Sequence, residues 1–219
     1  MSLREALQEL AQSARARRAP EAQAVIDAAL DELRGSGLAR ASLQVGEMAP
    51  DFRLLDTDDR PVSLEEGLRH GPVVVTFYRG GWCPYCNLAL RALHQALARL
   101  RAESASLYAI TPQRADGVRE TRERLGLDFP MLADPGNKVA RLFGLSFRLP
   151  DELIALYRRL GVDIAAANGA REWELPLPAT YVVAPDGTVA YAMIDVDYTN
   201  RADPEDVLAA LRRLKETAT

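Results

Sequence analysis

From residue 45 onward the chain alternates between strand-like and helix-like patterns of hydrophobic residues. Residues 72–78 form a continuous apolar, mostly β-branched run, which is typical of a strand covered on both faces. Leucines then recur every three or four residues between positions 90 and 100, the spacing of one face of a helix. Further strands are expected at 106–110, 130–133, 181–184 and 189–194, and further helices at 115–125, 138–143 and from 203 onward. This order predicts an α/β fold with a mixed central sheet flanked by helices.

Residues 1–44 differ from the rest and are expected to form a helical N-terminal extension. Apolar residues recur at helical spacing on both sides of Pro20, which suits the first position of a second helix. We expect this extension to pack on the main domain or on a partner subunit, so a homodimer is one possible assembly. Residues 45–219 form the main domain, in which residues 144–178 interrupt the alternation. This insertion is predicted to hold one helix, at 151–160, and an irregular stretch whose aromatic residues belong to the core or to a wall of a cleft.

Composition and charge narrow the classes of function. The chain has 219 residues, 48% of them hydrophobic, and 27 Lys and Arg against 31 Asp and Glu give a net charge of −4. Such a chain lacks the basic excess that nucleic-acid binding needs, and its longest apolar runs are too short to cross a membrane. We see no secretory signal at the start of the chain and expect a cytoplasmic protein. No glycine-rich nucleotide motif is present, so no cofactor is expected.

The two cysteines are the candidates for chemistry. Cys83 and Cys86 lie between the predicted buried strand and an amphipathic helix, which places Cys83 at the start of that helix. The helix dipole and unpaired N–H groups there are expected to lower the pKa of the Cys83 thiol. Pro84 suits the first helical turn, and Cys86 follows one turn later. We therefore predict that Cys83 is the nucleophile and Cys86 the more buried thiol that resolves it into a disulfide.

Two other interpretations of the cysteine pair stay open. A structural zinc site needs four ligands, and only His70 and His94 remain as candidates, neither at ligand spacing. We therefore predict no metal in the chain itself, although zinc shared across a dimer is an alternative. Two inert buried cysteines are the other interpretation, and redox chemistry is favoured over both.

Pro178 stands in the segment Leu177–Thr180, which immediately precedes the predicted strand at 181–184. A cis proline in this place could end strand pairing and present a backbone edge beside the thiols. A single X-Pro bond is cis only about one time in twenty, so this feature supports the redox interpretation only together with the cysteine pair.

Several further segments resemble the peroxiredoxin branch of the thioredoxin superfamily, the alkyl hydroperoxide reductase/thiol-specific antioxidant family. These segments are residues 45–52 (VGEMAPDF), 129–134 (FPMLAD) and 179–183 (ATYVV). The resemblance runs from about residue 45 to the C-terminus. It implies a thioredoxin-like fold and assigns the role of peroxide-attacking cysteine to Cys83.

The chain departs from that family at three positions. Typical members carry a proline and a Thr or Ser where this chain has Thr76 and Gly80, and an arginine where it has Pro178. The loop Gly-Gly-Trp-Cys-Pro-Tyr-Cys, with Trp82, Pro84 and Tyr85, instead resembles a thioredoxin or glutaredoxin site on a peroxiredoxin body, as in the peroxiredoxin-like subgroup with this loop. Arg79 is a candidate for the missing cation or simply a solvated charge. Thr76, Tyr78 and Tyr85 are candidates for the missing hydroxyl.

Three functions follow from these observations. The leading one is a thiol-dependent peroxidase that reduces hydrogen peroxide or organic hydroperoxides through a Cys83–Cys86 disulfide and is restored by thioredoxin or a glutathione-type reductant. The first alternative is a thioredoxin-like protein disulfide reductase, favoured by the Cys-Pro-Tyr-Cys loop. The second is a non-enzymatic redox-sensing or zinc-binding module whose N-terminal helices contact a partner.

Overall fold

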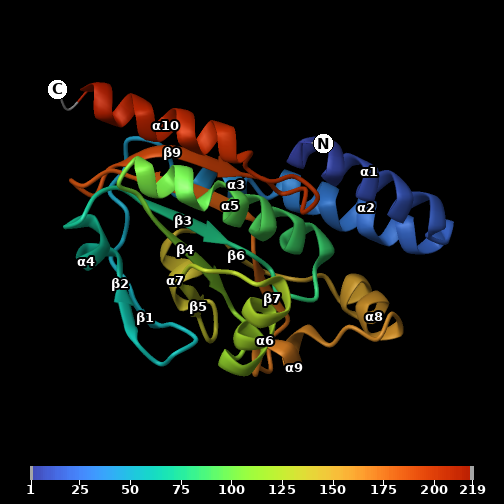
Figure 1. Cartoon of the computed structure of the whole chain (residues 1–219). Coiled ribbons are helices and arrows are strands. Elements are labelled where there is room, and N and C mark those ends of the chain that lie inside the picture. Colours follow the sequence, from blue (N-terminus) through green and yellow to red (C-terminus); the bar gives the residue numbers. More distant parts are fainter. Residues whose placement is uncertain (1, 218–219) are drawn as a thin grey trace.

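A seven-stranded mixed sheet forms the centre of the protein in the computed structural model, which describes residues 2–217 (Figure 1). The strand order is β2-β1-β5-β4-β3-β8-β9. The β3–β4 and β4–β5 pairs are parallel, and the remaining pairs are antiparallel. The strands are β1 (Arg53–Leu55), β2 (Pro61–Ser63), β3 (Val73–Phe77), β4 (Ser106–Thr111), β5 (Met131–Ala133), β8 (Ala179–Val183) and β9 (Val189–Ile194). The predicted α/β class with a mixed sheet is confirmed.

Strand β3 lies inside the sheet, and all five of its residues are buried. Because side chains alternate between the two faces of a strand, its continuous apolar run supplies both faces. Val74 belongs to the cluster on one face, whereas Val73 and Val75 belong to the cluster on the other. The expected doubly covered strand is therefore present, and it ends directly before the cysteine loop.

Helices cover both faces of the sheet (Figure 1). On one face, α5 (Pro84–Ala102) packs against α10 (Pro204–Thr217) and α1 (Leu3–Arg17). The opposite face is covered by α4 (Leu64–Leu68) and α7 (Lys138–Leu142). Helix α6 (Ala115–Leu125) packs on β5. The side chain of Ser63 caps α4 by accepting a hydrogen bond from the Glu66 N–H at 3.1 Å.

The helices expected on either side of Pro20 are α1 and α2 (Pro20–Gly35), and a short α3 (Leu38–Ala41) follows. Pro20 is the first residue of α2, where its missing N–H has no partner to lose. Helix α1 packs on α5, while α2 packs on α8 (Asp151–Arg159). The N-terminal helices therefore lie against two separate parts of the same chain.

Residues 144–178 are more regular than expected. Besides α8, they contain α9 (Ile164–Asn168) and a two-stranded antiparallel sheet of β6 (Ser146–Arg148) and β7 (Glu174–Pro176). The predicted irregular stretch is thus wrong. Three-residue strands are too short to show a two-residue alternation, and their pairing joins residues far apart in the sequence, so no local pattern marks them.

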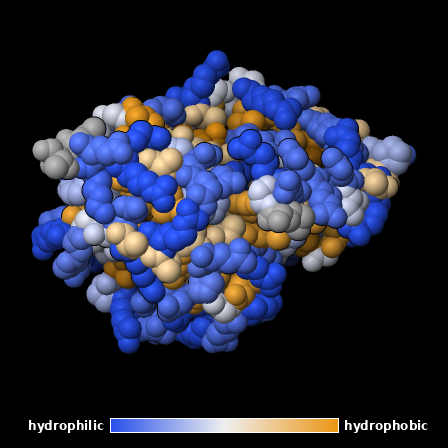
Figure 2. All heavy atoms as spheres, turned by 45° about the horizontal axis from the view of Figure 1, so that its top comes forward, coloured by the Kyte–Doolittle hydropathy of each residue, from blue (hydrophilic) through white to orange (hydrophobic). Residues whose placement is uncertain are grey.

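The face shown in Figure 2 is mostly hydrophilic, with apolar residues visible in a discontinuous band across its middle. Within residues 2–217, the structure contains no helix with the length and apolar character needed to span a membrane.

Candidate active site

The cysteine pair lies at the junction of β3 and α5. Cys83 is the residue before α5, Pro84 begins the helix, and Cys86 lies one turn further on. Both cysteines are free thiols, and their residues are only 2% and 0% exposed. The predicted placement on a strand-to-helix loop is therefore present, but both sulfurs are more deeply covered than expected.

Gly80 and Gly81 allow the loop to turn tightly before the cysteines. Gly80 has a φ of +147°, which L-residues with side chains rarely adopt, and its carbonyl accepts a hydrogen bond from the Cys83 N–H at 3.1 Å. A side chain at Gly80 would collide with the indole of Trp82, and one at Gly81 would collide with Thr121. The loop thus depends on both glycines for its close packing.

Two arginines flank the sulfurs. The Nη2 of Arg201 donates a hydrogen bond to the Sγ of Cys86 at 3.0 Å. Arg79 is only 4% exposed, and its side chain faces both thiols closely enough to interact with their charge. Within the described part of the chain, neither arginine has a carboxylate at ion-pair distance. Arg79 is thus a buried cation at the site and not a solvated charge.

Aromatic rings surround Arg79. Its Cζ lies 4.5 Å from the ring centre of Tyr198, 5.1 Å from that of Trp82 and 5.9 Å from that of Tyr157. The Nη2 also donates a hydrogen bond to the Tyr157 hydroxyl at 2.6 Å. Burial alone would lower the pKa of Arg79, but its interactions with Tyr157, Cys83 and Cys86 raise it above its ordinary value. Arg79 therefore keeps its positive charge inside the protein.

The two thiols titrate differently. Burial raises the pKa of Cys83, and the hydrogen bond to Cys86 and the negative charge of Cys86 raise it further. Burial opposes ionisation of Cys86 too, but the hydrogen bond from Cys83 and the cations of Arg201 and Arg79 outweigh it and lower its pKa well below the ordinary value. The expectation that the helix start lowers the pKa of Cys83 is therefore wrong. The reason is that Arg201 binds the second sulfur directly, while the first donates its proton to that sulfur.

The remaining candidates for the site are Trp82, Pro84, Tyr85 and Thr76. Trp82 packs over Arg79, and Tyr85 is buried with its ring 5.5 Å from that of Tyr198, so both lie at the site. Pro84 begins the helix with its ring exposed. The Thr76 hydroxyl is buried within the sheet, where it lies 2.9 Å from the Thr180 hydroxyl and is thus already paired.

Pro178 does not take the conformation that we considered. The described residues contain no cis peptide bond, so the bond before Pro178 is trans. Its carbonyl accepts a hydrogen bond from the Asp195 N–H at 3.3 Å, which joins it to the loop after β9. Pro178 is buried and, together with Arg79, lines a cavity beside the site.

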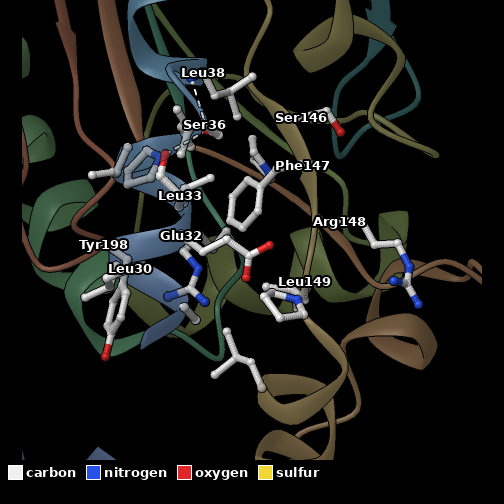
Figure 3. A pocket seen from close by; sticks show the side chains of 18 of the residues that line it. Leu30, Glu32, Leu33, Ser36, Leu38, Ser146, Phe147, Arg148, Leu149 and Tyr198 are labelled. Carbon is white, nitrogen blue, oxygen red and sulfur yellow. Dashed lines mark hydrogen bonds between the residues drawn. The ribbon is translucent and has the colours of Figure 1, made fainter. Parts of the chain in front are cut away.

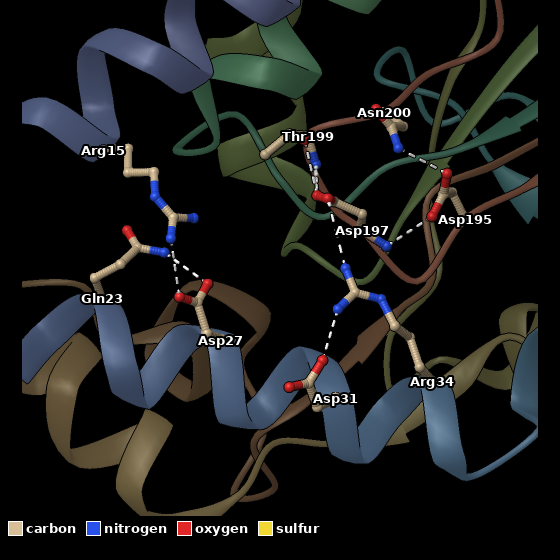
Figure 4. Close-up of polar contacts among 9 residues, drawn as sticks. All are labelled: Arg15, Gln23, Asp27, Asp31, Arg34, Asp195, Asp197, Thr199 and Asn200. Atoms are coloured by element: carbon tan, nitrogen blue, oxygen red, sulfur yellow. Dashed lines mark hydrogen bonds and ion pairs between the residues drawn. The ribbon is translucent and has the colours of Figure 1, made fainter.

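The loop of residues 195–203 completes the site, and sequence reasoning missed it. It carries Tyr198 and Arg201, and Arg201 also donates a hydrogen bond to the Tyr198 carbonyl at 2.6 Å. Figure 4 shows how Asp197 joins this loop to α2: its carboxylate lies 3.9 Å from Arg34 and accepts a hydrogen bond from the Thr199 N–H at 3.0 Å. No spacing in the sequence relates this loop to the cysteines, more than a hundred residues earlier.

The described residues contain no cluster of side chains that could bind a metal ion. Among residues 2–217, no three His, Cys, Asp or Glu side chains gather where they could hold one ion. His94 instead accepts a hydrogen bond at its Nδ1 from the Asp128 N–H at 3.3 Å.

The fold and the sequence together define the family. The sequence model of the AhpC/TSA family matches residues 45–192, which is more than half of the chain, and the chain belongs to this family. Peroxiredoxin Q of Oryza sativa subsp. japonica is 29% identical over 160 residues, covering 73% of this chain and 61% of the rice protein. The chain therefore spans less than two thirds of that relative's length. Peroxiredoxin Q of Sedum lineare is 27% identical over 179 residues, covering 80% of this chain and 81% of its own.

Solved structures agree on the fold. The crystal structure of peroxidoxin BcpB from Mycobacterium tuberculosis superposes with a TM-score of 0.61 at 23% identity, covering 78% of this chain and 97% of that one. AhpC from Enterococcus faecalis gives a TM-score of 0.60 at 20% identity, with 80% and 93% covered. The thioredoxin-like fold implied by the resemblance is confirmed. Membership of the Gly-Gly-Trp-Cys-Pro-Tyr-Cys subgroup stays a prediction.

Proposed function

We propose that this protein is a thiol-dependent peroxidase that reduces hydrogen peroxide or organic hydroperoxides through Cys83 and Cys86. The observation that carries the proposal is the buried dithiol flanked by Arg79 and Arg201, two cations that have no carboxylate partner in the described part of the chain. Such cations stabilise a thiolate and the negative charge that develops on the oxygen leaving a peroxide. The similarity to peroxiredoxin Q proteins supports the same activity.

In the first step, Cys83 transfers its proton to the Cys86 thiolate along their hydrogen bond and attacks one peroxide oxygen. A sulfur–oxygen bond forms as the oxygen–oxygen bond breaks, and the electron pair of that bond leaves on the second oxygen. The departing alkoxide or hydroxide takes the proton from Cys86 and leaves as alcohol or water. Cys83 is thereby oxidised to a sulfenic acid, and Cys86 is again a thiolate.

In the second step, the Cys86 thiolate attacks the sulfur of the Cys83 sulfenic acid. The disulfide forms, and the hydroxide released takes a proton from solvent to become water. Arg79 and Arg201 replace, in this proposal, the arginine that typical family members carry at the position of Pro178. An external dithiol of the thioredoxin or glutathione type then restores the pair by thiol–disulfide exchange, for which the loop that carries Cys83 has to open after the disulfide forms, because both cysteines are buried in the dithiol form.

Burial of the sulfurs favours a small substrate over a protein disulfide. Exchange with a protein disulfide requires a sulfur of the partner to reach one of these thiols in line, yet the cysteine residues are 2% and 0% exposed. A peroxide needs only a narrow path. We therefore favour the peroxidase over the disulfide reductase. We also propose that the protein is cytoplasmic. Whether it forms a homodimer is a question for a measurement of its mass in solution.

The test is rapid mixing of reduced protein with hydrogen peroxide and with organic hydroperoxides. Trp82 lies against Arg79 and reports the site, and a Trp173→Phe background removes the second indole. We expect second-order oxidation far faster than that of free cysteine, followed by a first-order phase for disulfide formation. Oxidation no faster than that of free cysteine with every peroxide would overturn the proposal.

A further inference from the structure

A cavity of about 350 Å³ lies beside the dithiol, between α2 and the segment of residues 144–178. Figure 3 shows its two walls: Leu30 and Leu33 of α2 on one side, and Phe147 and Leu149 on the other. The volume lies within the range of small-molecule sites, roughly 300 to 1,000 Å³. At the roughly 30 Å³ that one water occupies in the liquid, the cavity has the volume of about a dozen waters.

Most of the cavity wall is apolar, which identifies the greater part of its ligand. Besides the four residues above, aliphatic side chains come from α2 and α8, and prolines come from the ends of β7 and β8. A wall of this kind offers no partners for a sugar or a nucleotide, whereas it matches an unbranched aliphatic chain.

Among the polar residues of the wall, Arg79 is the one whose charge also acts on the two thiols. Arg79 is only 4% exposed, and its Nε has no hydrogen-bond partner among the described residues. Beside it, the Tyr157 hydroxyl accepts from Arg79 and so keeps its own proton free to donate. A buried cation and a phenol in one apolar wall match a carboxylate head group.

The charged side chains of the wall determine where in the cavity the carboxylate of such a ligand would bind. Glu32 lines the cavity from the exposed side of α2, and Arg148 lines it from the opposite wall, also exposed. Both side chains are exposed, so water and salt screen their charges more than they screen the charge of Arg79. Arg79 is desolvated, and an anion that pairs with it gains more than one at the rim.

We propose that this cavity binds a medium-chain aliphatic carboxylate, with the chain between α2 and α8 and the carboxylate on Arg79 and Tyr157. The site is separate from peroxide chemistry, although it shares Arg79 with the dithiol. Oxidation of the Cys83 thiol and Cys86 thiolate to a disulfide removes one proton and two electrons and leaves no negative sulfur beside Arg79. The carboxylate is then the counter-charge that Arg79 lacks, so the disulfide form binds it more tightly. By linkage, the ligand stabilises the disulfide by the same factor.

The test is calorimetric titration of sodium decanoate, below its micelle concentration, into the reduced and the oxidised full-length protein. The disulfide is made with diamide, an azo compound that takes up the two electrons and the proton of the pair together with one proton from solvent, so the test needs no peroxide activity. We expect one decanoate per chain, and affinity about tenfold higher for the oxidised form. 1-Decanol, which has the chain without the charge, is expected to bind about tenfold more weakly than decanoate.

Two matched variants locate the site. Ala29→Phe fills the cavity from α2 and is expected to abolish decanoate binding. Ala28→Phe places the same ring on the exposed side of the same helix, and this variant is expected to bind decanoate with the wild-type affinity. In wild-type protein, the methyl resonances of Leu30, Leu33 and Leu153 are expected to shift with decanoate, a readout that does not depend on the variants folding.

Each contrary result has a definite meaning. Absence of decanoate binding to both redox forms, or equal binding to Ala28→Phe and Ala29→Phe with no shift of these methyl groups, overturns the site. Equal affinity of decanoate and decanol, or of reduced and oxidised protein, overturns the role of Arg79. A protein that binds decanoate as expected but reduces no peroxide contradicts only the proposed function.

Discussion

The loops of residues 78–86 and 195–203 meet at the same two sulfurs, and each brings one arginine to them. The first loop is a contiguous motif in which Arg79 stands four residues before Cys83. The second contributes Arg201, whose Nη2 reaches Cys86 at 3.0 Å only because β9 and α10 bring the distant loop back to the start of α5. The comparison shows that local sequence supplies the nucleophiles, while the charge on the sulfurs depends on tertiary structure.

The largest expected effect is on the first loop. Cys83→Ser removes the sulfur that we propose attacks the peroxide, and peroxide consumption should fall at least about a thousandfold. The measurement is the initial rate with hydrogen peroxide and excess reductant, with circular dichroism to confirm that the variant is folded. A variant that retains a tenth of the activity would show that Cys83 is not the attacking thiol.

The two arginines can be compared directly. Arg79→Met removes a buried cation and is expected to lower the second-order rate of oxidation about a hundredfold, by analogy with the loss of one charge-stabilising donor. Arg201→Met should lower it about tenfold, because Arg79 remains beside the sulfurs. Arg60→Met, an exposed arginine in the β1–β2 turn, is the matched control and should match wild type. Equal oxidation rates in all three variants would show that neither Arg79 nor Arg201 accelerates the reaction with peroxide.

The pH dependence tests the same pair of arginines through ionisation. Because the pKa of Cys86 is lowered by the hydrogen bond from Cys83 and by the two cations, the first thiolate should form at a pH below the ordinary thiol value of about 8.5. Oxidation and alkylation should therefore be fast above that lowered pKa and slow as the pH falls through it. In Arg201→Met the midpoint should move to higher pH. An unchanged midpoint in alkylation with iodoacetamide would contradict the role given to Arg201.

The smallest expected effect concerns the attachment of the second loop. Arg34 on α2 lies 3.9 Å from Asp197, and its side chain is half exposed, so this ion pair contributes at most about 1 kcal/mol to stability. Arg34→Met should change the oxidation rate less than about twofold, because the hydrogen bonds within the loop still hold Arg201. A tenfold loss would show that α2, and not the loop itself, positions this arginine. Stopped-flow rates and denaturant unfolding measure the two quantities.

Features with a local sequence signal can be predicted from the sequence, whereas those that depend on contacts between distant segments cannot. The run at β3, the leucines of α5 and Pro20 at the start of α2 each carry a local signal, and these elements were predicted in place. The cysteine pair was found for the same reason. The β6–β7 sheet and Arg201 depend on contacts between distant segments, which no periodicity reports. The depth of burial of Arg79 was likewise invisible, because it arises from rings on three separate elements.

The most direct test of the central claim is to identify the sulfur that peroxide oxidises first. In Cys86→Ser, Arg79 and Arg201 still stabilise a Cys83 thiolate, so one equivalent of hydrogen peroxide should convert Cys83, more slowly than in wild type, to a sulfenic acid that a dimedone probe traps, detected by mass spectrometry of the peptide. In Cys83→Ser, Cys86 should remain largely unlabelled in the same time. Labelling of Cys86 at the wild-type rate of oxidation, with Cys83 unlabelled in the companion variant, would contradict the account and exchange the roles of the two thiols.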